Sequence, residues 1–290
     1  MTETHEDAVE DVIKLLDLEP LEVNLFRGLS PDVSWQRVFG GQVIGQALVA
    51  AYRTVENRIC HSLHAYFIRP GDPKVPIIYE VDRSRDGKSF TTRRVVAIQH
   101  GKQIFNLAAS FQIPEDGFEH QASMPDVPPP ESLPSDEELR LAVIDKVPEH
   151  IAKHFSRPRP IEMRHVNRQD FINPQPTEPV QHVWFRPRAS VGDDLPLNQC
   201  MLAYASDMTL LDTCFRPHGI TWLSGKLQSA SLDHAMWFHH PFKMDDDWML
   251  YTMDSPSASG ARGFNRGSIY TRDGLLVASV AQEGLFRYRG

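Results

Sequence analysis

The chain repeats one order of elements twice, and this repeat constrains the fold more than any other feature. An apolar helical segment at residues 40–51 precedes a strand pattern at residues 61–70 that ends at a proline. The same order recurs at residues 197–213 and 229–241, where the strand pattern also ends at a proline. An aromatic pair occupies the same place before each proline. The fold must therefore contain two similar units.

Antiparallel strand patterns follow each of these segments. Tight turns at His100-Gly101 and Asp273-Gly274 each join two strand patterns, as in β-hairpins. Further strands are expected near residues 21–27 and 181–186, ahead of each helix. A helix followed by several antiparallel strands indicates the α+β class. The pattern predicts a double hotdog, in which two helix-wrapped antiparallel sheets meet edge to edge within one chain and hide two exposed edges.

A change in composition divides the chain. Residues 113–160 are rich in proline and acidic side chains, which is typical of a largely extended linker. We therefore expect an N-terminal hotdog at residues 1–112, this linker at 113–160, and a C-terminal hotdog at residues 161–290.

Charge and hydropathy exclude several classes of function. The formal net charge of -8 argues against a nucleic-acid partner. No apolar run approaches the ~20 residues of a membrane span. The acidic, polar start of the chain does not resemble a secretory signal, and its end carries no peroxisomal tripeptide. We expect a cytoplasmic protein.

Cysteines and histidines show no metal-ligand spacing. The three cysteines form no CxxC pair, and the 13 histidines include no HExxH pattern, so we expect neither a metal nor a cofactor. Arginines cluster in two segments and could bind the phosphates of an anionic ligand, although scattered arginines more often pair locally. The clusters are Arg69, Arg83, Arg85, Arg93 and Arg94, and Arg262, Arg266 and Arg272.

One carboxylate interrupts the second apolar helical segment. Asp207 shares a helical face with Cys200, Ala203 and Leu210, which are apolar. A carboxylate in such surroundings is unfavourable unless it is paired or hydrogen-bonded. Asp207 is therefore a candidate general base, and its alternative role is to cap a neighbouring segment or to pair with an arginine.

Several motifs together resemble the acyl-CoA thioesterase II family. They run in the family's order over about residues 20–288, so the resemblance covers nearly the whole chain. The motifs are FGGQVIGQAL at 39–48, HSLHAYFIRPGD at 61–72, DGKSF at 86–90, ASLDHAMWFH at 230–239, SASGARGF at 257–264 and VAQEG at 280–284.

This resemblance implies a double hotdog fold and the hydrolysis of fatty acyl-CoA to a free fatty acid and coenzyme A. It also implies a catalytic Asp, a Thr or Ser on the following strand, and a Gln near the C-terminus. These motifs fall on Asp207, Ser231 and Gln282. Ser229 lies two residues away on the same strand face and is the main alternative for the hydroxyl.

The chemistry of these residues suits thioester hydrolysis. Asp207 can take a proton from water, and Ser231 and Gln282 can hold the water because a hydroxyl and an amide both donate and accept hydrogen bonds. The chain has no GxSxG motif, so a covalent serine is not expected. Direct attack by water is preferred, and an acyl-enzyme through Asp207 stays open.

Five further residues are candidates for substrate binding. Gly40 and Gly41 begin the first helix, whose free N–H groups could stabilise an oxyanion, or they only permit a tight turn. The other candidates are His64, Arg93 and Arg262.

The two helices differ in the residue expected at the site. By superposition, Gln46 should fall near the place of Asp207. Because an amide has no basicity, the first half would then serve binding and shape rather than chemistry.

Two other functions are open. The same fold could carry an enoyl-CoA hydratase with an Asp–His dyad, although the nearest histidine after Asp207 in the sequence is His218, beyond the helix end. The chain could also be a non-catalytic acyl-CoA sensor. Family analogy further implies a homodimer or a higher homo-oligomer.

Overall fold

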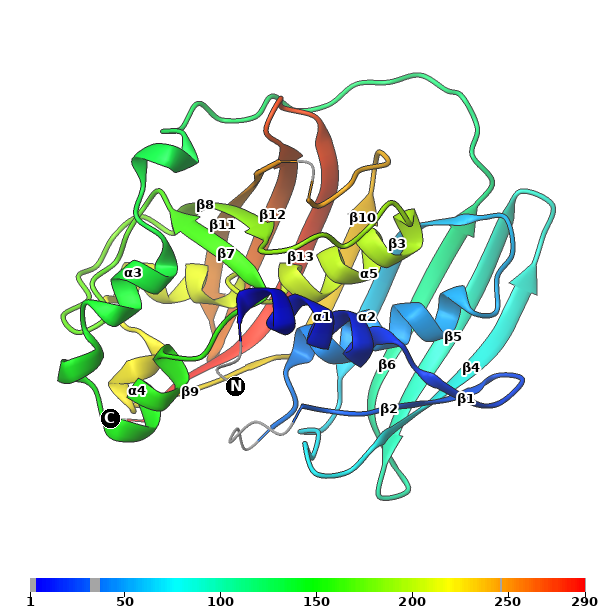
Figure 1. Ribbon diagram of the computed structural model, residues 1–290, viewed down its shortest axis with the longest axis horizontal. Coiled ribbons are helices and arrows are strands. Elements are labelled where there is room, and N and C mark those ends of the chain that lie inside the picture. The colour runs from blue at the N-terminus through cyan, green and yellow to red at the C-terminus, as the bar shows by residue number, and fades with distance from the viewer. Residues whose placement is uncertain (1–3, 32–36, 246, 290) are drawn as a thin grey trace.

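One antiparallel sheet runs through both halves of the computed structural model, which describes residues 4–31, 37–245 and 247–289 (Figure 1). Its path through the described residues is β1-β2-β4-β5-β6-β3-β10-β13-β12-β11-β8-β7, and β9 also pairs with β13. The strands are β1 (Glu19–Glu22), β2 (Leu25–Gly28), β3 (Ile59–Phe67), β4 (Ile77–Asp86), β5 (Phe90–Gln99), β6 (Lys102–Gln112), β7 (Ile161–His165), β8 (Val180–Pro187), β9 (Leu227–Ser231), β10 (Asp233–Phe238), β11 (Met249–Ser259), β12 (Arg262–Thr271) and β13 (Leu276–Tyr288).

The central helices α2 and α5 lie on one side of the sheet, with α1 beside them (Figure 1). The helices are α1 (His5–Leu16), α2 (Gly40–Tyr52), α3 (Asp136–Leu141), α4 (Glu149–Phe155) and α5 (Leu195–Ser206), and the 3-10 helices are η1 (Pro130–Ser132), η2 (Ile144–Lys146), η3 (Leu211–His218) and η4 (Trp222–Ser224). Most residues of α2 and α5 are buried, so both helices are apolar around most of their circumference.

The two halves join through strands β3 and β10. These strands are antiparallel, and the register places Met236 opposite Leu63 and Ala235 opposite His64. The side chains of Met236 and Leu63 are fully buried, while the neighbouring His64 is exposed on the other face. The expected edge-to-edge junction and the double hotdog fold are therefore confirmed.

The helix predicted at residues 197–213 is too long. Helix α5 ends at Ser206, with Asp207 as its C-cap, and the chain continues after a short turn as η3. Leu211 and Cys214 of η3 pack where glycines of the sheet leave room: a Cβ on Gly284 would overlap Leu211, and one on Gly263 would overlap Cys214. The apolar run thus reflects two buried segments that pack separately, rather than one helical face.

The extended conformation predicted for residues 113–160 is wrong for its second part. Residues 113–129 carry no helix or strand, but η1, α3, η2 and α4 follow within the same stretch. Helix α3 has a capping box in which Ser135 and Glu138 satisfy each other's backbone N–H groups. Acidic composition therefore marks helix N-termini here as well as a linker.

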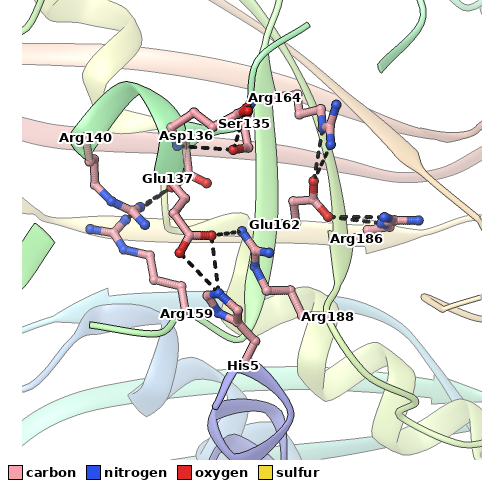
Figure 2. A network of polar contacts seen from close by, with 11 residues as sticks. His5, Ser135, Asp136, Glu137, Arg140, Arg159, Glu162, Arg164, Arg186 and Arg188 are labelled. Atoms are coloured by element: carbon pink, nitrogen blue, oxygen red, sulfur yellow. Dashed lines mark hydrogen bonds and ion pairs between the residues drawn. The ribbon is translucent and has the colours of Figure 1, made fainter. Parts of the chain in front are cut away.

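Ion pairs attach this segment to the second half and to α1 (Figure 2). Glu137 of α3 pairs with Arg188 at 3.0 Å and with His5 at 3.2 Å. On β7, the carboxylate of Glu162 lies 2.8 Å from Arg164 and 3.2 Å from Arg186. The Glu137 contacts tie regions distant in sequence to one edge of the sheet, and the Glu162 contacts lie within β7 and between β7 and β8.

None of the helices in the described part of the chain has the length and apolar character needed to cross a bilayer.

The junction can be tested with two substitutions on neighbouring strands. Met236→Ala should lower the free energy of unfolding by about 2–5 kcal/mol, because it leaves a cavity in the core. His64→Ala removes an exposed side chain at the same junction and should change this free energy much less. Urea unfolding measures both. Equal losses for the two variants would contradict the buried junction.

Candidate active site

Asp207 lies at the end of α5 and is held by two side chains from the sheet. Its side chain is only 5% exposed. Gln282 of β13 donates from Nε2 to Asp207 Oδ1 at 2.6 Å, and Ser231 of β9 donates from Oγ to the same oxygen at 3.2 Å. The structure thus brings together the three residues of the predicted catalytic set. Ser229 makes no hydrogen bond to Asp207 within the described residues.

The N-terminus of α2 faces the same carboxylate. The N-cap residue Phe39 provides no side-chain hydrogen bond to α2. A Cβ on Gly40 would lie 2.5 Å from Asp207 Oδ2, and Asp207 accepts a hydrogen bond from the backbone N–H of Gly41. A carboxylate is unfavourable at the C-terminus of its own helix and favourable at the N-terminus of another. The end of α2 therefore offsets the unfavourable end of α5.

The carboxyl group of Asp207 has a shifted pKa. Burial raises this pKa from 3.8 to about 6, and the hydrogen bonds from Gln282, Ser231 and Gly41 lower it in part. The group is therefore mostly ionised at pH 7 and can accept a proton, which a general base requires.

His234 of β10 is a site residue that the sequence analysis missed. Its ring is fully buried, and Nδ1 lies 3.9 Å from Asp207 Oδ1 and 3.1 Å from Gln282 Nε2. The alternation of β10 contained the signal, because His234 shares the inward face with Met236 and Phe238.

Asp212 of η3 is a second carboxyl group of the site that was missed. Burial and the nearby Asp207 raise its pKa to about 7. Its position five residues after Asp207, in the same apolar segment, was the available signal.

A cavity of about 440 Å³ opens beside Asp207. Its walls come from the start of α2, the segment after β3, the start of β6, the turn between α5 and η3, and β9, so both halves contribute. The residues that matter most here are Arg37, Gly40, Arg69, Asp207, Asp212, Ser229 and Ser231.

Three of the proposed substrate-binding residues lie elsewhere. His64 is exposed and packs edge-on against Trp237 at 5.2 Å. Arg93 is buried and donates to Thr54 at 2.8 Å and to Asp86 at 2.6 Å. Arg262 pairs with Glu283 at 2.8 Å. None of the three lines the cavity beside Asp207, whereas Gly40 does and Gly41 contacts Asp207 directly.

Gln46 lies close to the position in the first half that corresponds to Asp207: the Tyr79 hydroxyl of β4 donates to Gln46, as the hydroxyl of Tyr251, at the same place in β11, donates to Ser206. Gln46 lies within α2, where it donates to the carbonyl oxygens of Leu15 and Leu29.

The aromatic pairs before the two prolines begin at Tyr66 and Trp237, so Cys60, six residues before Tyr66, matches Ser231, six residues before Trp237. The backbone N–H of Cys60 donates to the Tyr52 hydroxyl at 2.8 Å, so an aromatic hydroxyl at the end of α2 is the partner of the position that matches Ser231.

A larger cavity of about 810 Å³ lies where the end of α2 meets the start of α5, and its wall includes Tyr52, Leu197 and Cys200. Its lining also contains Asp194, whose carboxylate caps α5 by accepting from Leu197 N at 3.0 Å. We place the candidate active site in the smaller cavity, because the buried Asp207 carboxylate, which Gln282 and Ser231 hold, lies in its wall.

The fold and this polar set define a double hotdog thioester hydrolase. Residues 152–285 match the acyl-CoA thioesterase family model, and residues 30–112 match the model of the acyl-CoA thioesterase N-terminal domain. The chain belongs to the acyl-CoA thioesterase II family, and it is an enzyme that hydrolyses acyl-CoA thioesters.

Individual relatives support this assignment. Acyl-CoA thioesterase 2 of Haemophilus influenzae is 40% identical, over 97% of this chain and 99% of the relative. Human acyl-coenzyme A thioesterase 8 is 44% identical, over 96% of this chain and 89% of the relative. The crystal structure of acyl-CoA thioesterase II TesB2 from Mycobacterium marinum is 46% identical, with a TM-score of 0.78 over 96% of this chain and 98% of that chain.

The raised pKa of Asp207 predicts a pH-dependent loss of stability. Between pH 3.8 and about 6 the folded protein keeps a proton that the unfolded chain releases, so the free energy of unfolding falls as pH rises through this window. Asp207→Asn removes this loss. Its stability relative to wild type should therefore increase between pH 4 and pH 7, by up to about 3 kcal/mol.

Urea unfolding across this pH range measures the difference. Asp82→Asn, at an exposed position, is the control for the change in charge. A difference between Asp207→Asn and wild type that does not vary with pH would show that Asp207 titrates normally.

Proposed function

We propose that Asp207 is the general base that activates water for the hydrolysis of fatty acyl-CoA to a free fatty acid and coenzyme A. The observation that supports this proposal is the buried Asp207 carboxylate, which accepts hydrogen bonds from Gln282 and Ser231 at the wall of a cavity. Family membership supports the reaction, and the geometry supports the roles of the residues.

The proposed hydrolysis consumes one water molecule and needs no cofactor. Asp207 removes a proton from water while the water oxygen bonds to the thioester carbonyl carbon. The tetrahedral intermediate then loses the sulfur, and the departing thiolate of coenzyme A takes the proton from the Asp207 carboxyl. Attack by Asp207 itself, through an acyl anhydride, is the alternative route, and it needs the same ionised carboxylate.

Ser231 and Gln282 orient the reacting water. The Ser231 hydroxyl gives its proton to Asp207 and keeps lone pairs that can accept a hydrogen bond. Gln282 Oε1 is buried and, within the described residues, has no hydrogen-bond partner, so it can accept from the same water. The backbone N–H of Gly40 stays our proposed oxyanion donor, since Gly40 lines the cavity, whereas the Gly41 N–H is already bonded to Asp207.

The hydratase alternative needs a histidine beside Asp207. The histidine beside Asp207 in the structure is His234, at 3.9 Å, rather than His218. However, burial lowers the pKa of His234 to about 3, and both ring nitrogens are already engaged by Ser206 and Gln282. These contacts suit a structural role better than proton transfer to a substrate. Incubation with crotonyl-CoA should accordingly cause no loss of the enoyl absorbance.

Activity measurements on three variants test the proposed base and hydroxyl. Asp207→Asn should lower kcat for palmitoyl-CoA by about 10²–10⁴-fold, because the amide cannot accept the proton. Ser231→Ala should lower kcat about tenfold through the loss of one hydrogen bond. Ser229→Ala, on the same strand, should leave kcat nearly unchanged.

Release of free thiol, followed with a thiol reagent, measures all three variants. Normal turnover by Asp207→Asn would exclude Asp207 as the base. A larger loss of kcat in Ser229→Ala than in Ser231→Ala would assign the role of the hydroxyl to Ser229.

Two arginines are placed to bind the phosphates of coenzyme A. Arg37 and Arg69 line the cavity and are exposed, and the Arg69 guanidinium donates to the Gln103 carbonyl at 2.6 Å. Guanidinium groups suit phosphate binding because they present several donors in one plane. We therefore assign the anionic part of the substrate to this side of the cavity.

Arg69→Gln should raise KM for palmitoyl-CoA about tenfold and leave kcat nearly unchanged, since binding of the phosphates is equal in the ground and transition states. Arg262→Gln is the matched control, because Arg262 is also exposed but pairs with Glu283 away from the cavity. Steady-state kinetics measure both. A rise in KM for Arg262→Gln alone would indicate that the phosphates bind near β12 instead.

The cytoplasmic location and the assembly into a homodimer or higher homo-oligomer stay predictions. A chain-length series of acyl-CoA substrates would define the preferred fatty acyl group.

A further inference from the structure

A chain of hydrogen bonds links the last turn of α5 to Gln282 through His234. Ser206 Oγ lies 2.9 Å from the Ala203 carbonyl oxygen and 2.9 Å from His234 Nε2. On the other side of the ring, Nδ1 lies 3.1 Å from Gln282 Nε2. Ser206, His234 and Gln282 are all at most 1% exposed, so bulk solvent does not compete for these bonds.

The partners determine which ring nitrogen carries the proton. Ser206 donates to the Ala203 carbonyl, so its oxygen accepts from His234 Nε2–H. The amide nitrogen of Gln282 only donates, so His234 Nδ1 must accept. The ring is thus neutral with its proton on Nε2, in agreement with burial, which lowers its pKa to about 3.

The orientation of the Gln282 amide follows from the charge of Asp207. A rotated amide would place its oxygen 2.6 Å from the carboxylate oxygen of Asp207, where two acceptors repel each other. It would also remove the donor that His234 Nδ1 needs. The ionised carboxylate and the histidine lone pair therefore select the same orientation of Gln282.

We propose that His234 is a positioning residue, whose Nδ1 lone pair holds the Gln282 amide with one N–H toward Asp207 and Oε1 free to receive the reacting water. This proposal rests on the proposed function of Asp207 and Gln282. Without the lone pair, the second amide N–H of Gln282 would be buried without an acceptor, and the side chain would rotate away. Asp207 would then lose the 2.6 Å hydrogen bond from Gln282, and its pKa would rise.

The other titratable groups around Asp207 do not hold the Gln282 amide in place of His234. Asp212 of η3 is a like charge that disfavours ionisation of its neighbour. Tyr251 of β11 donates its hydroxyl to the Ser206 carbonyl at 3.1 Å, and burial raises the pKa of this hydroxyl, so it stays neutral. The other contacts of Asp207, from the Ser231 hydroxyl of β9 and the Gly41 N–H of α2, do not titrate in this range.

Two substitutions of similar size separate positioning from packing. His234→Leu fills the space but offers no acceptor, whereas His234→Asn can place its Oδ1 near the position of Nδ1. For His234→Leu we expect kcat to fall about tenfold with KM nearly unchanged, and the acid limb of the kcat–pH profile to move to higher pH. His234→Asn should recover most of both properties. Circular dichroism verifies that each variant is folded.

A wild-type pH limb in folded His234→Leu, or equal losses in the two variants, would overturn the proposal. ¹⁵N NMR of the histidine-labelled wild-type protein provides a test that needs no variant. We expect a proton on Nε2 and none on Nδ1 at pH 7, and a proton on Nδ1 would overturn the proposal. Failure of the proposed function itself is recognised separately, by full activity of Asp207→Asn.

Discussion

The close antiparallel contact between α2 and α5 is the interaction on which the site depends. Glycines allow it: a Cβ on Gly41 would overlap the Tyr204 carbonyl, and one on Gly45 would lie 3.2 Å from the Cys200 carbonyl oxygen. Because the helices run in opposite directions, the N-terminus of one meets the C-terminus of the other. Asp207 sits at this meeting point, where the dipole of its own helix disfavours a carboxylate and that of α2 favours it. Neither half could keep the charge buried alone.

The junction between the two halves of the sheet positions the side chains that reach Asp207 from the strands. Pairing of β3 with β10 makes the sheet continuous and fixes how the strands behind the helices are aligned. Two side chains then reach Asp207 from the sheet. Gln282 comes from β13, which pairs with β10, and Ser231 comes from β9, which pairs with β13. Since strand register is set by the apolar side chains that are buried along the junction and by the turns, the positions of these side chains depend on packing far from the cavity.

Much of the fold was predictable because the sequence repeats its pattern, and the residues around Asp207 because their motifs occur together. Features that depend on tertiary packing were not. The end of α5 at Ser206 reflects the room that Gly263 and Gly284 leave for η3, and the helices after residue 130 reflect ion pairs with Arg188 and His5. His234 was accessible from strand alternation, but its partner Gln282 lies 48 residues away and is joined to it only by the register of β10 and β13. The contact of Tyr52 with Cys60 likewise needed the three-dimensional structure.

The contact between Tyr52 and Cys60 has a consequence for how such a chain diverges. Two identical single hotdog chains would carry every substitution twice, once in each site. In a fused chain a residue can change in one unit alone, and here an aromatic hydroxyl satisfies the Cys60 N–H where the other unit has a carboxylate and a serine. A fused chain can therefore keep the buried carboxylate in one unit while the surface of the other unit changes independently.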